Sequence, residues 1–464
     1  MVALHREESF VIIELGSHTT KAMQDVTDVN KLPTVVIRSR AGIAKQDEPQ
    51  EPKDTNMGVD DAAGEQAKSP QAEPTPRVDS PQVETPQPVD STDKPASVNG
   101  SSSSNSNDQD SSGPNYVFGS ALESASTDTL ETTVDIISGG FVKDWDALSA
   151  FLRHIVTKEL GIRIPDNTSA FLFSIPALWP KSDLENLAQI AFEDLNAPSI
   201  MVVEQPLLAA YGNGGVTGVV IDMGHDTTTI TPIVDSIVQN SSITQTTVSG
   251  AAVTARLHEL LEADTGLCEQ FEGTHVPLEF ATALKESGLC TLQLPSDQPK
   301  NSTGDSSEQQ SFEFGGKTYM VGKKILAQAP DILVHPTEPS NEPALTTLIR
   351  QSILACDTDK RSALWENMHV VGGSSQFGGL RELLQFELEN TVLPASNIFA
   401  LSQTRDTKFH TMPEYFVGWR GCAHWAAFLG ACLVAKVALA DARHFVSRAE
   451  YNDGGPSVIH TKSF

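Results

Sequence analysis

The first segment that could do chemistry is FVIIELGSHTTKA, in which an apolar run turns through Gly16 and Ser17 and reaches Lys21. A turn of this kind at the end of a strand points backbone N–H groups at phosphate oxygens, and the lysine adds positive charge. His18 does not fit the pattern, because a phosphate loop needs a residue without a side chain where the backbone approaches the ligand. The segment therefore predicts either a phosphate loop that has been altered or a structural turn.

A second turn offers similar groups. The strand-like run VTGVVI leads into Asp222 and Gly224, which are followed by His225, Asp226 and the apolar run TTITPIV. The acid could hold magnesium, and the backbone N–H groups could bind phosphate oxygens. Taken alone, each turn is more simply explained as a structural turn, because strand–glycine turns occur throughout α/β proteins.

Alternating strands and helices are expected to position these turns. Four runs rich in β-branched or aromatic residues predict strands, namely FVIIEL (10–15), AFLFSI (170–175), SIMVVE (199–204) and VTGVVIDM (216–223). Between them, apolar residues at helical spacing predict one helix with Asp144 as its N-cap and another that begins at a capping box of Ser182 and Glu185. This order favours an α/β fold whose sheets are covered on both faces.

Charge and composition narrow the class of protein. The chain has 464 residues, enough for two lobes, and a formal net charge of -28, which disfavours direct nucleic-acid binding and contact with anionic membranes. Its five cysteines form no CxxC pair, which indicates reduced thiols in an intracellular protein. The longest apolar run, WAAFLGACLVAKVAL from Trp425, is too short to span a bilayer and predicts a buried helix.

One long segment is not expected to fold. Residues 46–112 contain no Ile, Leu, Phe, Tyr or Trp and carry 14 acids against 4 bases. Such a segment cannot bury enough apolar surface to offset the cost of ordering its backbone. We therefore predict a disordered acidic insert at 46–112, and a shorter polar loop at 295–311.

The two turns, in this order and with the segments around them, resemble the paired phosphate hairpins of the actin family. ISGGFVKDWDAL resembles the actin stretch before its first long helix, and the run from Ser174 to Gly214 resembles the strand–helix–strand that leads to the hinge. The resemblance implies an actin-like ATPase fold, with two lobes around a central nucleotide cleft. Residues 1–45 and 113–214, with 413–464, would form the first lobe, and 215–412 the second.

Particular residues match the nucleotide site of the actin family by position. The resemblance implies that TALKESGLC contributes Lys285 and Glu286 beside the base and ribose, and that VVGGSSQFGG forms the adenosine loop. Gln205 stands where actin orients the attacking water, and Asp222 where it holds the metal. The implied site consists of Gly16, Ser17, Lys21, Gln205, Asp222, Gly224, Lys285, Glu286, Gly372, Gly373 and Ser374.

Four residues depart from the actin pattern. His18 would occupy space beside the β-phosphate, and Glu14 replaces an aspartate near the metal. His225 and Asp226 replace an acid and a glycine in the second turn, and Asp226 would repel a triphosphate. We therefore expect a degenerate nucleotide site in a protein that is not an enzyme, with no catalytic residue, no metal and no required cofactor. Bound ATP with slow or no turnover is the alternative.

The C-terminal stretch PEYFVGWRGCAHWAAFLGACLVAK, followed by RAEYNDGGPSVIH, most resembles the actin-related protein 9 class of fungi. Members of that class are nuclear subunits of the SWI/SNF and RSC chromatin remodellers. The resemblance implies a scaffold that binds a helical segment of the remodeller's ATPase together with a second actin-related protein and other subunits. The acidic insert is expected to replace actin's small outer subdomain, which would remove one surface of filament contact.

Two other functions stay open. A pointed-end actin-related subunit of dynactin would also be divergent and non-polymerising, but cytoplasmic. An active sugar-kinase-like or chaperone-like ATPase would keep small residues in both turns, which this chain does not. By resemblance, Glu414–Arg420 and the helix from Trp425 border the cleft that binds a partner helix. There Tyr415 and Trp419 are either interface anchors or ordinary core residues.

Overall fold

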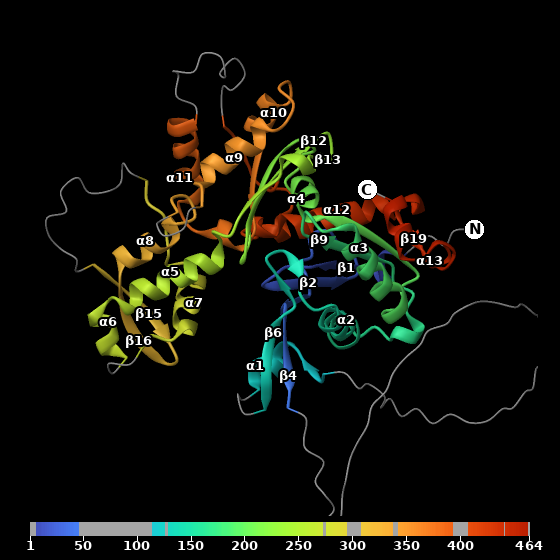
Figure 1. The fold of residues 1–464 in the computed structure, drawn as a ribbon, viewed down its shortest axis with the longest axis horizontal. Helices are drawn as coiled ribbons and strands as arrows, with labels where there is room; N and C mark the ends of the chain where they lie inside the picture. Colours follow the sequence, from blue (N-terminus) through green and yellow to red (C-terminus); the bar gives the residue numbers. More distant parts are fainter. Residues whose placement is uncertain are drawn as a thin grey trace, which may run out of the picture. The chain divides into compact units, whose positions relative to one another are not determined.

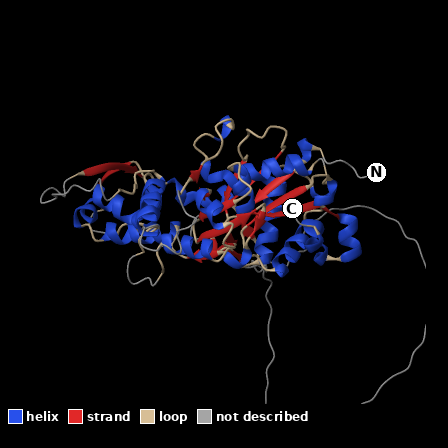
Figure 2. Ribbon diagram, turned by 90° about the horizontal axis from the view of Figure 1, so that it is seen from above, coloured by secondary structure: helices blue, strands red, loops and turns tan. Residues whose placement is uncertain are grey.

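Two mixed β-sheets with helices packed on them form the two lobes of the molecule (Figure 1). The computed structural model describes residues 6–45, 114–125, 129–271, 275–294, 308–336, 342–392, 407–439 and 441–462. All the elements below belong to one of the two units into which the chain divides, the one composed of Met1–Lys45 and Asn115–Phe464. Figure 2 shows the strands of this unit with helices on either side.

The sheet of the first lobe has the order β19-β10-β9-β1-β2-β3. Strands β1, β9 and β10 run parallel, whereas β2, β3 and β19 are antiparallel to their neighbours. The strands span Val11–Glu14 (β1), Thr19–Gln24 (β2), Val35–Arg38 (β3), Phe171–Ile175 (β9), Ser199–Glu204 (β10) and Val446–Ser447 (β19). The strands predicted at 10–15, 170–175 and 199–204 are therefore confirmed.

The sheet of the second lobe repeats this arrangement in the order β13-β12-β11-β17-β18. The hairpin of β11 and β12 corresponds to that of β1 and β2, and β17 lies parallel to β11 as β9 lies parallel to β1. The strands span Gly218–Met223 (β11), Thr228–Val234 (β12), Ile237–Val238 (β13), Met368–Val371 (β17) and Phe409–His410 (β18), and Thr244–Thr246 (β14) pairs with β12. Each lobe thus presents one hairpin turn next to a parallel strand.

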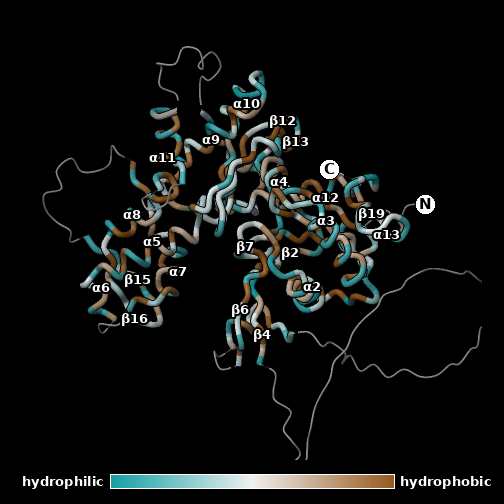
Figure 3. The backbone as a smooth tube through the Cα atoms, viewed as in Figure 1, coloured by the Kyte–Doolittle hydropathy of each residue, from teal (hydrophilic) through white to brown (hydrophobic). Residues whose placement is uncertain are grey.

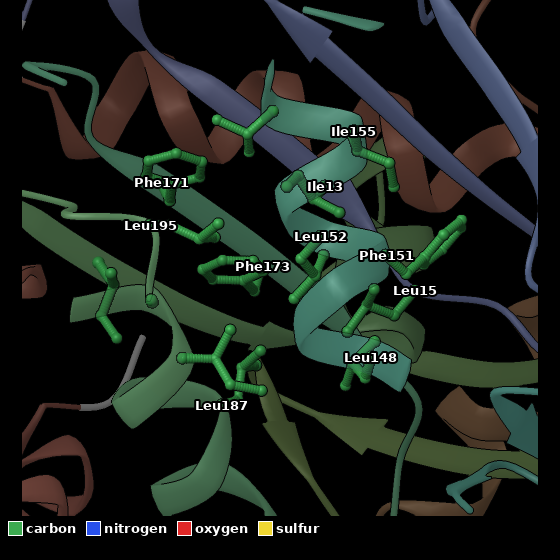
Figure 4. Packing of buried hydrophobic residues seen from close by; sticks show 14 of the residues in the cluster. Ile13, Leu15, Leu148, Phe151, Leu152, Ile155, Phe171, Phe173, Leu187 and Leu195 are labelled. Atoms are coloured by element: carbon green, nitrogen blue, oxygen red, sulfur yellow. The ribbon is translucent and has the colours of Figure 1, made fainter. Parts of the chain in front are cut away.

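Side-chain alternation along the central strands fills two cores at once. Val11, Ile13 and Leu15 belong to one buried cluster, whereas Phe10 and Ile12 belong to another on the opposite face. Successive side chains of a strand point to opposite faces, so a strand buried on both sides is apolar throughout. Figure 4 shows the first cluster, in which Ile13 of β1 and Leu15, just after this strand, meet the side chains of the helix labelled Leu148 to Ile155.

Helices cover both faces of each sheet. In Figure 3 hydrophobic residues recur along the strands and helices, with hydrophilic residues between them. The helices on the first lobe are α2 (Trp145–His154), α3 (Lys181–Gln189), α4 (Gln205–Gly212), α12 (Ala426–Ala438) and α13 (Arg448–Gly454). Those on the second lobe are α5 (Gly250–Glu262), α6 (Thr265–Gln270), α7 (Leu278–Glu286), α8 (Lys323–Asp331), α9 (Leu345–Leu354), α10 (Arg361–Glu366) and α11 (Leu380–Glu387).

Helices α4 and α12 cross in close contact, and their buried cluster contains residues of both sheets. A Cβ atom on Gly430 would lie 1.8 Å from the carbonyl oxygen of Leu208, and one on Gly212 would lie 2.0 Å from that of Ala426. Only glycine allows backbones to approach so closely. The prediction of a buried helix at WAAFLGACLVAKVAL is confirmed, since nine of the 13 residues of α12 are buried.

The expectation that the acidic insert replaces actin's small outer subdomain is wrong. The small outer part of the first lobe is present as a three-stranded sheet of β4 (Arg40–Ala44), β5 (Tyr116–Val117) and β6 (Leu130–Asp135) with helix α1 (Gly119–Ser124). It forms because Ala41 and Phe118, on either side of the long insert, are buried in the first-lobe core. The segment 46–113, which includes the predicted disordered insert, lies outside the described residues.

The polar loop predicted at 295–311 is too long at its C-terminal end. Residues 295–307 lie outside the described residues, but β15 (Gln309–Phe314) already begins at 309 and pairs with β16 (Lys317–Gly322). Polar residues can form this strand because its side chains alternate, so that Phe312 and Phe314 pack on a core cluster while the residues between them are exposed. The hairpin turns through Gly315 and Gly316, which both have positive φ angles.

Other predictions from composition can also be compared with the structure. The five cysteines all lie within the described residues and are free. Where the structure describes the chain, none of its helices is both long and apolar enough to cross a bilayer.

A short hairpin of β7 (Ile137–Ser138) and β8 (Phe141–Val142) precedes α2 and reaches the cleft described next.

Candidate nucleotide site

The two hairpin turns meet in one cavity of about 520 Å³, whose walls come from both lobes. All the residues that the sequence predicted for a nucleotide site line this cavity: Gly16, Ser17, Lys21, Gln205, Asp222, Gly224, Lys285, Glu286, Gly372, Gly373 and Ser374. The fold therefore brings together residues that are up to 358 positions apart, the separation from 16 to 374. Their role in binding a nucleotide remains a prediction.

The first turn follows β1 and leads into β2. Glu14 and Lys21 lie opposite each other in the hairpin register, and their buried side chains form an ion pair. A Cβ atom on Gly16 would lie 2.6 Å from the carbonyl oxygen of Thr19, so the tight turn requires glycine. The hydroxyl of Ser39 donates to the carbonyl oxygen of Gly16 at 2.6 Å and fixes the turn from outside.

The second turn has the same backbone plan with different charges. Asp222 lies opposite Thr229, and the N–H of Gly224 donates to the carbonyl oxygen of Thr227 at 3.0 Å. Burial, together with the nearby charge of Glu14, raises the pKa of the Asp222 carboxyl to about 6, while Lys21 acts in the opposite direction. The charge of Lys21 thus acts on both carboxylates, and Lys21 forms an ion pair with Glu14.

The tips of the two turns touch through histidine rings. The rings of His18 and His225 stack with their centroids 4.2 Å apart at an angle of 29°. The guanidinium of Arg38 hydrogen-bonds to the His18 ring, and Glu286 lies 3.7 Å from His18 Nε2 and 3.8 Å from Arg38. Asp226 accepts a hydrogen bond of 2.9 Å from the backbone N–H of Gly139. The hydrogen bond between Arg38 and His18 lies within the first lobe, whereas the other contacts join one lobe to the other.

Burial and neighbouring cations keep His225 neutral. The loss of hydration, together with the charges of His18 and Lys285, lowers the pKa of His225 to about 4, whereas Asp226 acts in the opposite direction. A neutral imidazole stacks on another ring without the repulsion that two imidazolium ions would bring.

Two further residues predicted for the site, Gln205 and Lys285, already form hydrogen bonds with other groups of the protein. The Gln205 side-chain amide donates to the carbonyl oxygen of Leu15 at 2.6 Å, and so supports the first turn. Lys285 donates to Thr254 Oγ1 at 2.8 Å and to the carbonyl oxygen of Gly250 at 3.2 Å. Burial lowers the pKa of the Lys285 ammonium group.

The glycine-rich end of the cavity has more room. Gly372 has a φ angle of 86°, and a Cβ atom there would lie 2.5 Å from Asp222 Oδ1, so this turn also requires glycine. Ser374 Oγ donates to the carbonyl oxygen of Gly224 at 3.0 Å, which ties the turn to the second hairpin. Beside Gly373 there is open space, because no atom would lie within 4 Å of an added Cβ.

Sequence reasoning missed some residues of the cleft. Arg38 and Gly139 hold the hairpin tips, and His424 and Trp425 line the cavity next to Lys21, whose ammonium lies 5.9 Å from the Trp425 ring centroid. Burial lowers the pKa of His424 to about 4, with Lys21 adding to the effect. The glycine pair in ISGGF could have indicated that Gly139 makes a backbone contact. No pattern near Arg38 in the sequence indicates that it contacts His18.

The geometry can be compared with the needs of a nucleoside triphosphate and its metal. Stacked rings 4.2 Å apart leave no room for a phosphate between the two hairpin tips. Among the residues that the structure describes, no group of three or more His, Cys, Asp or Glu side chains is placed to hold a metal ion. Glu14 Oε2 is buried without a hydrogen-bond partner, but its other oxygen is bound by Lys21. The two rings therefore fill the space between the hairpin tips, whereas the cavity beside Gly373 has open space.

Comparison with known proteins adds the family. The sequence profile named Actin matches residues 5–464 of this chain. The SWI/SNF and RSC complexes subunit arp9 of Schizosaccharomyces pombe is 25% identical over 546 aligned positions, which cover 98% of this chain and 99% of that protein. Actin-like protein 9 of Mus musculus is 28% identical over 331 residues, covering 71% of this chain and 73% of the relative.

A third relative, actin-related protein 7 of Oryza sativa subsp. indica, is 26% identical over 344 residues, which cover 72% of this chain and 87% of that protein. These matches agree with the two related sheets and with the pair of hairpins that meet in one cleft. Since the family profile extends over almost the whole chain, this protein belongs to the actin family.

Proposed function

We propose that this chain is a non-polymerising, non-catalytic actin-related subunit of an ATP-dependent chromatin-remodelling complex of the SWI/SNF and RSC kind, and that it works in the nucleus. In that complex it binds a helical segment of the motor ATPase together with a second actin-related protein. The observation that carries the proposal is the match to S. pombe arp9 over 98% of this chain and 99% of that subunit. The mouse and rice relatives match only 71% and 72% of the chain.

The chemistry of the cleft supports a role without catalysis. Phosphoryl transfer depends on preorganised N–H groups and cations around the phosphates. Here the hairpin tips are filled by His18 and His225, and the Gln205 amide is bound to the backbone. A protein with this cleft serves its complex through its surface and its shape.

Two exposed apolar side chains mark a surface for the partner helix. The segment from Thr411 to Ala423 lines a second cavity of about 380 Å³. Next to it, Tyr415 and Val417 are 70% and 58% exposed, whereas Trp419 is only 1% exposed and donates from its indole N–H to the carbonyl oxygen of Val29 at 2.7 Å. Trp419 is therefore a core residue, and Tyr415 is the better candidate for an interface anchor.

The chain's acidity suits a basic helix. With a formal net charge of -28, the protein attracts a segment rich in Lys and Arg, and the association rate falls as salt screens the charges.

The direct test is coexpression of the full chain with the motor's helical segment and the second actin-related protein, followed by size-exclusion chromatography. A stoichiometric complex supports the proposal. Purification of the native protein with dynactin subunits, and no complex with the motor segment, would contradict both the partner and the nuclear location.

Tyr415→Ala should weaken binding of the motor segment by about 1–2 kcal/mol if the ring is a buried anchor. Leu278→Ala is the matched control, because Leu278 is also a large apolar side chain, 54% exposed, but belongs to α7. Equal affinities of the two variants would exclude Tyr415 from the interface while leaving the coexpression test unaffected.

The absence of catalysis has its own test. Phosphate release from Mg-ATP by the purified chain should not exceed the background rate, and Gln205→Ala should not change it. Turnover that disappears in Gln205→Ala would mean that the chain is an ATPase.

A further inference from the structure

The three residues that most depart from a phosphate-binding hairpin all contact the opposite lobe. His18 lies in the first lobe and stacks on His225 of the second. Asp226 of the second lobe accepts a hydrogen bond from the N–H of Gly139 in the first. Residues that would repel or exclude a triphosphate therefore have a positive use, which is to connect the two lobes.

Charged side chains reinforce the ring contact. Glu286 at the end of α7 lies 3.7 Å from His18 Nε2 and 3.8 Å from the guanidinium of Arg38. Contact with His18, followed by the charges of Arg38 and Lys285, lowers the pKa of the Glu286 carboxyl. By resemblance to actin, Glu286 would have been a contact for the nucleotide, but here its partners belong to the protein.

We propose that these residues form an interlobe clasp, which holds the lobes together across the cleft in the place where other members of the fold would need a nucleotide. The clasp consists of His18, Arg38, Gly139, His225, Asp226 and Glu286. It makes the closed arrangement a property of the chain alone, independent of ATP and of any remodeller subunit.

The clasp explains why several different contacts occur together at the hairpin tips, which the loss of nucleotide binding alone would not explain. Random loss of nucleotide binding would leave small or unpaired side chains in the turns. Instead, an aromatic stack, an ion-pair cluster and a backbone hydrogen bond lie at the same junction. The glycines that shape the turns are also still required by the close contacts of Gly16 and Gly372 with neighbouring atoms.

Hydrogen–deuterium exchange of the isolated full-length chain tests the clasp. His18→Ala should increase exchange in residues 224–227 of the opposite lobe, and His225→Ala should increase it in residues 15–18. The expected increase is about three- to tenfold, the range that an aromatic pair provides. The double variant should exceed either single variant only slightly, because both substitutions remove one shared contact.

His275→Ala is the matched control, since the His275 side chain is 97% exposed and its ion pair with Glu262 lies within its own lobe. It should change neither turn. If a ring variant fails to fold, Arg38→Gln replaces it, because the Arg38 side chain is 43% exposed and its loss should still increase exchange at 224–227.

Nucleotide provides the opposing measurement. Millimolar Mg-ATP should add no protection to either turn in the wild-type chain. Protection of both turns by Mg-ATP would overturn the clasp, because a nucleotide would then occupy its place. Exchange that rises only in the substituted turn would overturn it as well. Since no partner is present, these results are independent of the coexpression test of the proposed function.

Discussion

The hairpins β1–β2 and β11–β12 share one backbone plan but treat their acidic residues differently. Each places a buried carboxylate near the end of its first strand, Glu14 in one and Asp222 in the other. Lys21 lies opposite Glu14 and pairs with it, whereas Thr229 lies opposite Asp222 and brings no charge. Lys21 therefore stabilises the β1–β2 hairpin by pairing with Glu14. In the β11–β12 hairpin, Asp222 has no charged residue opposite it in the register.

The turns also differ in how tightly glycine is required. An added Cβ would lie 2.6 Å from a backbone oxygen at Gly16 but 3.0 Å from one at Gly224. Real Cβ atoms essentially never approach closer than 3.0 Å, so the first turn must shift to accept a side chain and the second can adapt. Substitutions in the two hairpins should therefore have unequal effects.

The largest effect is expected for Lys21→Met. It removes the only partner of the buried Glu14 carboxylate that the structure records among the described residues, and should lower the free energy of unfolding by about 3–5 kcal/mol. Chemical denaturation measures this change, and Glu14→Gln in the same chain should restore most of the loss. The matched control is Lys323→Met, which breaks an exposed pair with Glu308 and should cost about 0–1 kcal/mol. Equal costs would mean that Glu14 is not held by Lys21.

Next in size is the comparison of Gly16→Ala with Gly224→Ala. Gly16→Ala should lower the free energy of unfolding by about 1–3 kcal/mol, because the backbone must move away from the new methyl group. For Gly224→Ala we expect less than about 1 kcal/mol, since a small displacement relieves its contact. Denaturation curves of the two variants measure the order, and a larger cost for Gly224→Ala would reverse our view of the turns.

Much of the fold could be predicted because its signals are local. The apolar runs at 10–15 and 170–175 became β1 and β9, and Asp144 caps α2 by accepting from the N–H of Ala147. The predicted capping box of Ser182 and Glu185 is wrong. Helix α3 begins at Lys181 with Pro180 as its N-cap, so Ser182 already lies inside the first turn.

The contacts that decide the character of the cleft could not be predicted in the same way. The side chains of His18 and His225 could be recognised as misfits, because they replace small residues in turns. The two histidines lie 207 residues apart in the sequence, from 18 to 225. Their stacking depends on how the two lobes are placed relative to each other. Sequence patterns describe each turn but not the angle at which two turns meet.

The burial of Trp419 illustrates the same limit. A tryptophan in a loop that borders a cleft could be an anchor or a core residue, and composition cannot distinguish the two. In the structure, the backbone at Gly418 packs tightly against the backbone at Asn30, because a Cβ atom on Gly418 would lie 1.9 Å from the carbonyl oxygen of Asn30. This packing of two distant segments buries the neighbouring indole against Val29.

The free energy of unfolding that His225 of the second hairpin contributes should fall as the solution becomes acidic. The pKa of His225 is lowered from 6.5 to about 4, so the unfolded chain binds the proton more readily than the folded one. The stability that this group contributes is complete above pH 6.5 and is lost as the pH falls toward 4. His18, Lys285 and Arg38 oppose the charged form, and Asp226 favours it.

Denaturation of His225→Gln alongside the wild type isolates this effect, because the difference between them should shrink from pH 7.5 to pH 4.5. His335→Gln is a control of opposite sign. Hydrogen bonding to Asp331 raises the pKa of His335, so its contribution is present below pH 6.5 and is lost at higher pH. A constant difference between His225→Gln and wild type would mean that folding does not lower the pKa of His225.

The most direct comparison of the hairpins comes from neutralising each acid. Burial raises the pKa of Asp222 from 3.8 to about 6, so the folded state favours the protonated carboxyl, and the stability it contributes is lost as the pH rises through 6. Asp222→Asn imitates the protonated form and should therefore stabilise the protein at pH 8 but not below pH 3.8. Glu14→Gln should do the opposite at pH 8, because it leaves the buried Lys21 ammonium without its partner. Denaturation at the two pH values measures both variants, and effects of the same sign would show that the two carboxylates share Lys21 equally.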